Sequence, residues 1–383
     1  MKLHGRAFLR GAIEPDTLVT IRGGRLEIEQ VAHPPVEAER VAGIITPGFI
    51  DIHVHGGDGA DFMDADAEAN ERILRFHARH GTTAVAATTL SASPGDLRAA
   101  VAAIAAIALS ARTPGAGAEI CAVHLEGPYI NRDRAGAQDR ASIRPPDLQE
   151  VAALLAQAPR MKWLMTVAPE IAGVRALVER YRSEITFSIG HTAAGYDEAV
   201  AALAWGASHF THLFNAMSGL HHREPGVAGA ALTSESATAE LIADGIHVHP
   251  AVLRLAAQAM PQRIALVTDA MRACGLADGI YKLYQHDVTV GGGAARLEDG
   301  ALAGSLLTMD RAVQCMVEQA GLPLETVLPF ATEVPARILG IADRKGKLAG
   351  GYDADVVVLT PRLEVERVFV RGRELSAGHR LQP

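Results

Sequence analysis

The chain has 383 residues, of which 49% are hydrophobic and only 4% aromatic, so its core must consist mainly of aliphatic side chains. This is enough apolar material for one large core and a second, smaller one. The net charge of −8 argues against a broad nucleic-acid-binding surface but leaves room for local binding of an anionic small molecule.

Cysteine usage and the N-terminal residues indicate the compartment. Cys121, Cys274 and Cys315 are an odd number of cysteines with no CxxC spacing, which predicts reduced, buried thiols rather than disulfide bonds. The first residues, MKLHGRAFLRGAIEPD, lack the uninterrupted apolar stretch of a signal peptide. The longest apolar run, around residues 99–111, is too short to span a bilayer. We therefore expect a cytoplasmic protein that contacts neither membranes nor nucleic acid.

Both ends of the chain have the pattern of short strands and turns. LVTIRGGRLEIEQV near the N-terminus places a Gly-Gly turn between two β-like runs, and YDADVVVLTP and LEVERVFVRGREL near the C-terminus are similar. From residue 48 to about 340, short apolar runs that end in polar residues alternate with helical segments. The eight runs are GFIDIHVHG, TTAVAATTL, EICAVHLEGP, KWLMTVAPE, ITFSIGHT, SHFTHLFNA, AELIADGIHV and RIALVTDAM. Helices are expected at 66–80, 96–111, 147–157, 171–182, 195–205 and 250–260, and a loop over the Gly- and Pro-rich residues 216–238.

Eight strand–helix units favour an α/β fold with a closed (β/α)8 TIM-like barrel over an open doubly wound sheet. We assign the barrel to residues 48–344. The two β-rich ends, residues 1–47 and 345–383, are expected to pair as one small β-sandwich domain, because the termini of a barrel lie close together. The Gly-rich stretch GGGAARLEDGALAGS is interpreted as turns around a hairpin insert, since no GK[ST] follows it.

The barrel prediction has a consequence for function, because functional side chains of such barrels lie at the carboxyl ends of the strands. The polar residues expected at strand ends are His53, His55, His124, Glu126, His191, His212, Asp244, His247 and Asp269. Taken alone, His53 and His55 fit an ordinary half-buried strand as well as a metal site, since side chains at i and i+2 share a face. Imidazoles and carboxylates from separate strands, however, form a ligand set suited to Zn²⁺ or a similar divalent ion. Asp269, after the last strand, could then carry a proton from water to a leaving amine.

These motifs resemble the amidohydrolase superfamily, through PGFIDIHVHG, TDA and PARILGIADRKGKLAGGYDADVVVL. Within it, the motifs HLEGPYI, GHT, THLFNAMS, HHREPG, ADGIHV and LAGS together resemble the N-acetylglucosamine-6-phosphate deacetylase family. The resemblance implies hydrolysis of N-acetyl-D-glucosamine 6-phosphate to D-glucosamine 6-phosphate and acetate, in amino-sugar catabolism.

The resemblance also implies roles for individual residues. Glu126, His191 and His212 match metal ligands, and Asp269 matches the catalytic acid/base. The implied substrate contacts are Ala137, Gln138, Asn215, Ala216, Arg223, His247, Leu302, Ala303 and Gly304. Arg223 matches a phosphate ligand that can come from the neighbouring subunit of a homodimer, whereas the sugar contact at Gln138 is left open because family members differ there.

The number of ions is the main open point about the cofactor, which is expected to be zinc or iron. Some family members have lost the strand-1 histidines, but this chain keeps His53 and His55, so a second ion bridged by Glu126 is feasible. The bridging carboxylated lysine usual in the superfamily has no candidate, because Lys162 stands at the N-terminal end of its strand.

There are three alternative functions. The galactosamine epimer of the substrate differs at one hydroxyl, and the sequence does not decide between the two. A cyclic amidohydrolase of the dihydroorotase or hydantoinase kind is disfavoured by HREPG, by NAM and by the missing strand-4 lysine. A non-catalytic scaffold should have lost a ligand or Asp269, and this chain keeps them all.

Overall fold

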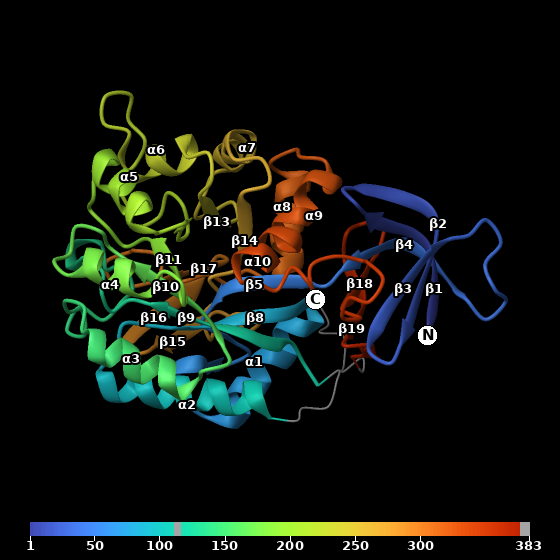
Figure 1. The fold of residues 1–383 in the computed structure, drawn as a ribbon, viewed down its shortest axis with the longest axis horizontal. Coiled ribbons are helices and arrows are strands. Elements are labelled where there is room, and N and C mark those ends of the chain that lie inside the picture. The colour runs from blue at the N-terminus through green and yellow to red at the C-terminus, as the bar shows by residue number, and fades with distance from the viewer. Residues whose placement is uncertain (111–115, 376–383) are drawn as a thin grey trace.

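The computed structural model of the chain describes residues 1–110 and 116–375, and its central part is an eight-stranded parallel barrel (Figure 1). The barrel strands are β5 (Phe49–Val54), β8 (Thr82–Thr89), β9 (Glu119–Glu126), β10 (Lys162–Val167), β11 (Ile185–Ile189), β12 (His209–Phe210), β13 (Thr238–Ile242) and β14 (Ile264–Val267). Each of the eight predicted runs coincides with one of them to within one residue at the start of the strand. The barrel closes where the Asp269 amide donates to the His53 carbonyl at 2.8 Å and the His55 amide donates to the Ala270 carbonyl at 2.9 Å. The predicted fold class is confirmed.

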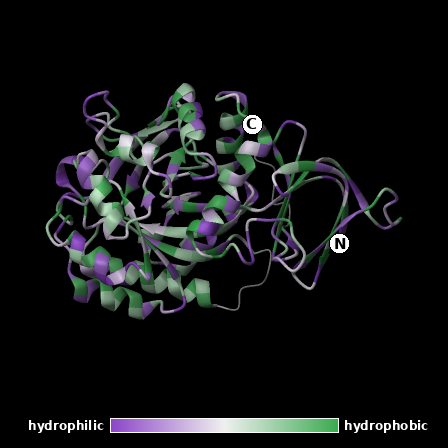
Figure 2. Ribbon diagram, turned by 45° about the horizontal axis from the view of Figure 1, so that its top comes forward, coloured by the Kyte–Doolittle hydropathy of each residue, from purple (hydrophilic) through white to green (hydrophobic). Residues whose placement is uncertain are grey.

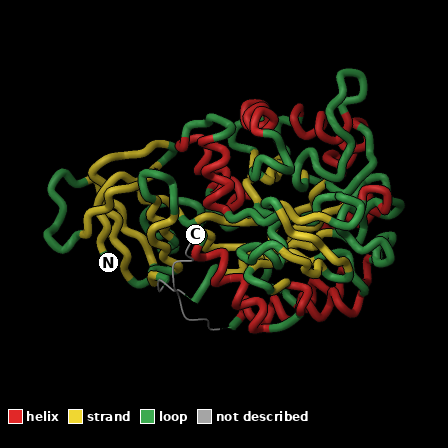
Figure 3. The backbone as a smooth tube through the Cα atoms, turned by 180° about the vertical axis from the view of Figure 1, so that it is seen from behind, coloured by secondary structure: helices red, strands yellow, loops and turns green. Residues whose placement is uncertain are grey.

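Helices cover the outside of the barrel, as Figure 3 shows from behind. They are α1 (Ala67–Arg79), α2 (Pro94–Leu109), α3 (Leu148–Gln157), α4 (Val174–Tyr181), α5 (Tyr196–Trp205), α6 (Gly226–Thr233), α7 (Pro250–Ala259), α8 (Met309–Glu318), α9 (Leu324–Ala331) and α10 (Glu333–Ile338), with 3-10 turns at Phe62–Asp64 and Arg132–Arg134. The six predicted helices are confirmed to within a few residues, and residue 111 of the second lies outside the described residues.

The expectation of a loop over residues 216–238 was wrong, because α6 lies within it. The segment GVAGAALT is buried along most of its length and follows Pro225, whose fixed backbone angle suits a helix start. A helix that is buried all round has no polar stripe, so its sequence lacks the amphipathic period by which helices are recognised. The three helices α8 to α10 after the last barrel strand were not predicted either.

Strands from both ends of the chain form a second sheet beside the barrel (Figure 1). Its seven strands are β1 (Lys2–Leu9), β2 (Ala12–Arg22), β3 (Arg25–Gln30), β4 (Glu39–Pro47), β18 (Val356–Leu359), β19 (Val365–Val370) and β20 (Arg373–Glu374). They are hydrogen-bonded in the order β20-β19-β18-β4-β1-β2-β3. The sheet curls around its own small core, which contains Val19, Val356 and Phe369. The curl brings β3 beside the residues that precede β18, where the Leu26 amide donates to the Tyr352 carbonyl at 3.0 Å. The domain boundaries at 47/48 and 344/345 stay predictions, and residues 376–383 lie outside the described part.

A buried group of charges joins the small sheet to the bottom of the barrel. Lys345 is buried, with only 2% of the residue exposed. Its ammonium contacts Asp355 and lies 3.0 Å from Glu119 and 3.3 Å from Asp353. Arg344 lies 2.7 Å from the same Glu119, which is the first residue of β9. Because each charge has an opposite partner, burial of the group is tolerated.

A hairpin insert lies between the last barrel strand and α8. It forms a three-stranded antiparallel sheet of β15 (Gly279–Leu283), β16 (His286–Gly291) and β17 (Ala294–Arg296), as the Gly-rich sequence predicted. Its apolar face packs on Leu90 and Met271 near the barrel mouth, where β6 (Gly56–Gly57) pairs with β7 (Ala60–Asp61). Figure 2 shows hydrophobic residues along the barrel strands. Cys121, Cys274 and Cys315 are free and belong to the buried core. No helix in the described ranges is both long and apolar enough for a membrane span.

Candidate active site

A pocket of about 360 Å³ lies at the carboxyl ends of the barrel strands. The predicted site residues that line it are His55, Glu126, Ala137, Gln138, His191, His212, Asn215, Ala216, His247, Asp269, Leu302 and Gly304. A larger cavity of about 780 Å³ lies between the small sheet and the opposite end of the barrel. Its lining, which includes Arg10, Arg337 and Lys347, contains no histidine, so we place the chemistry in the smaller pocket.

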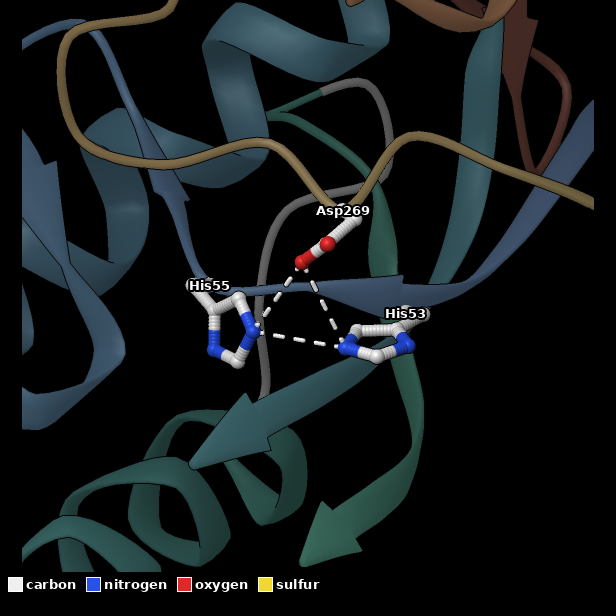
Figure 4. Close-up of side chains that lie close together, drawn as sticks. All are labelled: His53, His55 and Asp269. Atoms are coloured by element: carbon white, nitrogen blue, oxygen red, sulfur yellow. Dashed lines mark hydrogen bonds and ion pairs between the residues drawn. The ribbon is translucent and has the colours of Figure 1, made fainter. Parts of the chain in front are cut away.

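His53, His55 and Asp269 meet where the first and last barrel strands come together (Figure 4). The two histidines come from the end of β5 and are almost fully buried, and their Nε2 atoms are 3.3 Å apart. Asp269 follows β14 with a left-handed backbone (φ 49°), which turns its carboxylate toward both rings. Its Oδ1 lies 3.2 Å from His55 Nε2 and 3.5 Å from His53 Nε2.

Glu126, at the end of β9, is the centre of the site. Its Oε1 lies 3.0 Å from His191 Nε2, 3.2 Å from His212 Nε2 and 3.3 Å from His53 Nε2. Its Oε2 lies 3.2 Å from His55 Nε2. One carboxylate therefore contacts four imidazoles from three strands and joins the His53–His55–Asp269 group to the His191–His212 pair.

The electrostatics of the group favour bound positive charge. Burial alone would raise the pKa of the Glu126 carboxyl, but the charge of His53 and the hydrogen bonds from His191 and His212 hold that pKa well below its usual range. Burial would lower the pKa of His55, yet its bonds to Asp269 and Glu126 raise it to about 9. Two carboxylates among four imidazoles thus stabilise cations at this position.

The donor set fits a divalent metal ion. His191 Nε2 and His212 Nε2 face each other at 3.0 Å, a contact that requires one ring to carry a proton or both lone pairs to point at a shared cation. The potential ligand atoms of Glu126, His191 and His212 all lie within 4.8 Å of one another, and so do those of His53, His55 and Asp269. Mixed imidazole nitrogen and carboxylate oxygen is a ligand type that suits zinc and iron.

The sequence did not reveal the residues that contact the ligating side chains from behind, above all Glu240 on β13. Its Oε2 lies 2.9 Å from His53 Nδ1 and accepts from the His212 amide at 3.0 Å, and its Oε1 lies 3.2 Å from His209 Nε2. The signal was present as a lone acidic residue inside the otherwise apolar run AELI. His191 is held from behind as well, since its Nδ1 lies 2.8 Å from the Arg134 carbonyl.

His124 lies below the site instead of in it. Its Nδ1 is 3.1 Å from the Ile52 carbonyl and its Nε2 is 2.8 Å from Thr166 Oγ1, so both nitrogens already have partners. Burial lowers the pKa of His124 to about 3, which keeps the ring neutral. Lys162, by contrast, is the first residue of β10 and therefore lies at the opposite end of the barrel from the pocket.

The residues expected to contact substrate are distributed unevenly around the pocket. Gln138 does not project freely into it, because its amide donates to Glu126 Oε2 at 2.5 Å while its Oε1 accepts from the Ser91 amide at 2.6 Å. Ala303 stands between Leu302 and Gly304, which line the pocket, but is itself fully buried and does not line it. Arg223 does not line the pocket of its own chain; it is exposed and contacts the neighbouring His222 at 2.6 Å.

Comparison with known proteins places this site in a family. Residues 44–375 match the amidohydrolase family. An N-acetylglucosamine-6-phosphate deacetylase of Bacillus subtilis is 40% identical over 86% of this chain and 84% of its own length. An N-acetylgalactosamine-6-phosphate deacetylase of Escherichia coli O157:H7 is 37% identical over 90% of both chains.

A solved structure supports the same relationship. The N-acetyl-D-glucosamine-6-phosphate deacetylase of Mycobacterium smegmatis, in a variant crystallised with N-acetyl-D-glucosamine 6-phosphate, superposes with a TM-score of 0.91 at 34% identity. The match covers 98% of this chain and 99% of that one. The chain therefore belongs to the amidohydrolase family, alongside the deacetylases of N-acetylated amino-sugar 6-phosphates.

Proposed function

We propose that this protein is a metal-dependent hydrolase that removes the acetyl group from N-acetyl-D-glucosamine 6-phosphate and releases D-glucosamine 6-phosphate and acetate. The observation that carries the proposal is Glu126 in contact with four imidazoles beside Asp269, at the mouth of a barrel. The relatives from Bacillus subtilis and Mycobacterium smegmatis, similar over most of the chain, are deacetylases of this substrate.

Glu126, His191 and His212 would hold one zinc or iron ion, and His53, His55 and Asp269, with Glu126 between the groups, would hold a second. When bound there, such an ion would supply Lewis-acid polarisation of the acetamide carbonyl and a lower pKa for water at the site. Asp269 takes a proton from the attacking water, whose oxygen bonds to the amide carbon. The C–N bond then breaks, and Asp269 returns that proton to the leaving amine, so that acetic acid and a free amine form. The proton of acetic acid then passes to the amine, which leaves acetate and an ammonium group.

Substrate orientation is assigned to residues remote from the bond that breaks. Asn215, Ala216 and His247 line the pocket, with His247 held by Asp244 at 2.6 Å, and they are proposed to contact the sugar phosphate. Arg223 is exposed and outside the pocket of its own chain, which supports its action as a phosphate ligand in the pocket of a neighbouring subunit. The functional unit is then a homodimer. The three free, buried cysteines support a reducing, cytoplasmic location.

One alternative substrate has support of its own, since the Escherichia coli relative acts on N-acetylgalactosamine 6-phosphate. The two epimers differ at one hydroxyl, and discrimination between them depends on a single well-placed hydrogen bond. A cyclic amidohydrolase is disfavoured because β10 has Thr166, not a lysine, near its carboxyl end, which faces the pocket.

The test is an acetate-release assay with both epimeric 6-phosphates, run on metal-loaded wild type, on metal-stripped wild type and on Asp269→Asn. The proposal requires release from the glucosamine derivative by loaded wild type only. Release from the galactosamine derivative alone would move the substrate to the other epimer. No release from either would refute the function, and full release by Asp269→Asn would refute the assignment of Asp269.

A further inference from the structure

Glu240 is a buried carboxylate that touches the site from behind. It has no solvent exposure, it comes from the middle of β13, and it does not line the substrate pocket. Its Oε2 lies 2.9 Å from His53 Nδ1, on the side of the ring that faces away from Glu126 and Asp269. Glu240 thus contacts neither substrate nor the reacting atoms, and its effect on the site must pass through other residues.

The contact with Glu240 determines the state of the His53 ring. A carboxylate can only accept, so His53 Nδ1 must carry the proton and donate it to Glu240. When the ring is neutral, its single lone pair is then on Nε2, which points at His55, Glu126 and Asp269. A carboxylate behind a ligating imidazole fixes its tautomer and orientation and increases its basicity.

Among the four imidazoles of the site, only His53 has such a carboxylate partner in the described residues. The Nδ1 atoms of His55 and His212 are buried with no hydrogen-bond partner, and that of His191 faces a neutral carbonyl. The Glu240 carboxylate is itself held at both oxygens, because Oε2 also accepts from the His212 amide and Oε1 faces His209. A side chain fixed at this many points is suited to hold another in place.

We infer that Glu240 is a positioning residue that prepares His53 as a ligand and thereby determines whether the pocket holds a second metal ion. The inference rests on the proposed function for the identity of the site, but its consequence is a number of bound ions, which is measured without any substrate. Loss of Glu240 should weaken the ion near His53, His55 and Asp269 and leave the ion of Glu126, His191 and His212 in place.

The test compares wild type, Glu240→Gln and the control variant Thr238→Val, all stripped and then loaded with Zn²⁺ or Co²⁺. Thr238→Val removes the other partner of His209, 2.7 Å away, without touching Glu240 or His53. Bound metal is counted by elemental analysis, the affinities come from chelator competition, and the absorption bands of Co²⁺ report each ion separately. We expect two ions in wild type and in Thr238→Val, and a 10–100-fold weaker second ion in Glu240→Gln.

Three results would overturn the inference: a single ion in wild type, two ions of unchanged affinity in Glu240→Gln, or equal weakening of both ions. Should Glu240→Gln not fold, Glu240→Asp keeps the charge but shortens its reach, and it should also weaken the second ion selectively. Adding Glu240→Gln to a His53→Asn variant should cause no further metal loss, because Glu240 acts through His53. A wild type that binds two ions in a Glu240-dependent way but releases no acetate would refute the proposed function alone.

Discussion

Replacement of Lys345 by methionine is expected to destabilise the protein by removing one charge from the buried group that joins the barrel to the small sheet. The Lys345 side chain is 1% exposed and contacts Asp355, with Glu119 and Asp353 at 3.0 and 3.3 Å. Methionine keeps most of the volume of the aliphatic stem, so the loss is chiefly that of the ammonium.

The size of the effect follows from which carboxylates keep a partner. Arg344 still contacts Glu119 at 2.7 Å and Asp353 at 2.5 Å, so these two remain paired. Asp355 loses the one cationic partner that it has among the described residues and keeps one backbone donor, the Arg371 amide at 2.8 Å. A buried charge left without its partner costs about 3–5 kcal/mol, and we expect about 3 because only one carboxylate is stranded. With about 2.1 cal/mol/K of unfolding entropy for each of 383 residues, this corresponds to a melting temperature about 4 °C lower.

The pH dependence gives the prediction a second readout. Burial raises the pKa of Asp355, and Lys345 opposes that rise, so the pKa in the variant is higher still. An acid whose pKa is raised by folding binds more protons in the folded state, so stability increases as the pH falls. The deficit of the Lys345→Met variant should therefore shrink from pH 8 toward pH 5.

The assay is scanning calorimetry of wild type, Lys345→Met and the control Lys347→Met at equal metal loading. Lys347 is 48% exposed and makes one 3.3 Å pair with Glu333, so its loss should cost less than about 1 kcal/mol. A Lys345→Met protein that melts with Lys347→Met at pH 8 would refute the reasoning.

Three further predictions concern pH, metal and substrate. Burial would raise the pKa of Glu119, but Lys345 and Arg344 lower it to about 2. The Glu119 carboxylate therefore stabilises the folded protein fully above pH ~4.5, and this stabilisation is lost as the pH falls toward 2. The urea midpoints of wild type and Glu119→Gln should converge over that window. Removal of metal with a chelator should abolish acetate release and lower the melting temperature, and restored Zn²⁺ should reverse both, since ligands that bind only the folded state stabilise it. A protein that melts unchanged after verified metal loss would contradict this. Arg223→Ala should raise KM at least about 10-fold for the phosphorylated substrate but not for N-acetylglucosamine, whereas an equal effect on both would remove its assignment to the phosphate.

The fold was largely predictable because its signal is local. Each barrel strand is a short apolar run bounded by polar residues, and the polar residues at the ends, such as Glu126 and Asp269, mark the side of the barrel that carries the site. The helix α6 was missed because a largely buried Ala- and Gly-rich helix has no polar stripe.

The interior of the site was less predictable because its contacts join residues far apart in the sequence. Glu240 and His53 are separated by 187 positions, and only the register between strands brings them together. Gln138 is turned toward Glu126 by the Ser91 amide, 47 positions away, so its residue type alone does not tell whether it faces metal or sugar. Strand ends indicate which residues reach the mouth of the barrel, but not which side chains touch.

The central claim is hydrolysis of an amide bond at this pocket, and oxygen-isotope labelling tests it most directly. Metal-loaded enzyme is incubated with N-acetyl-D-glucosamine 6-phosphate in H₂¹⁸O, and both products are analysed by mass spectrometry. We predict one ¹⁸O atom in acetate and none in the amino-sugar phosphate, with no product from Asp269→Asn. Label in inorganic phosphate, or acetate formed without label, would contradict the claim.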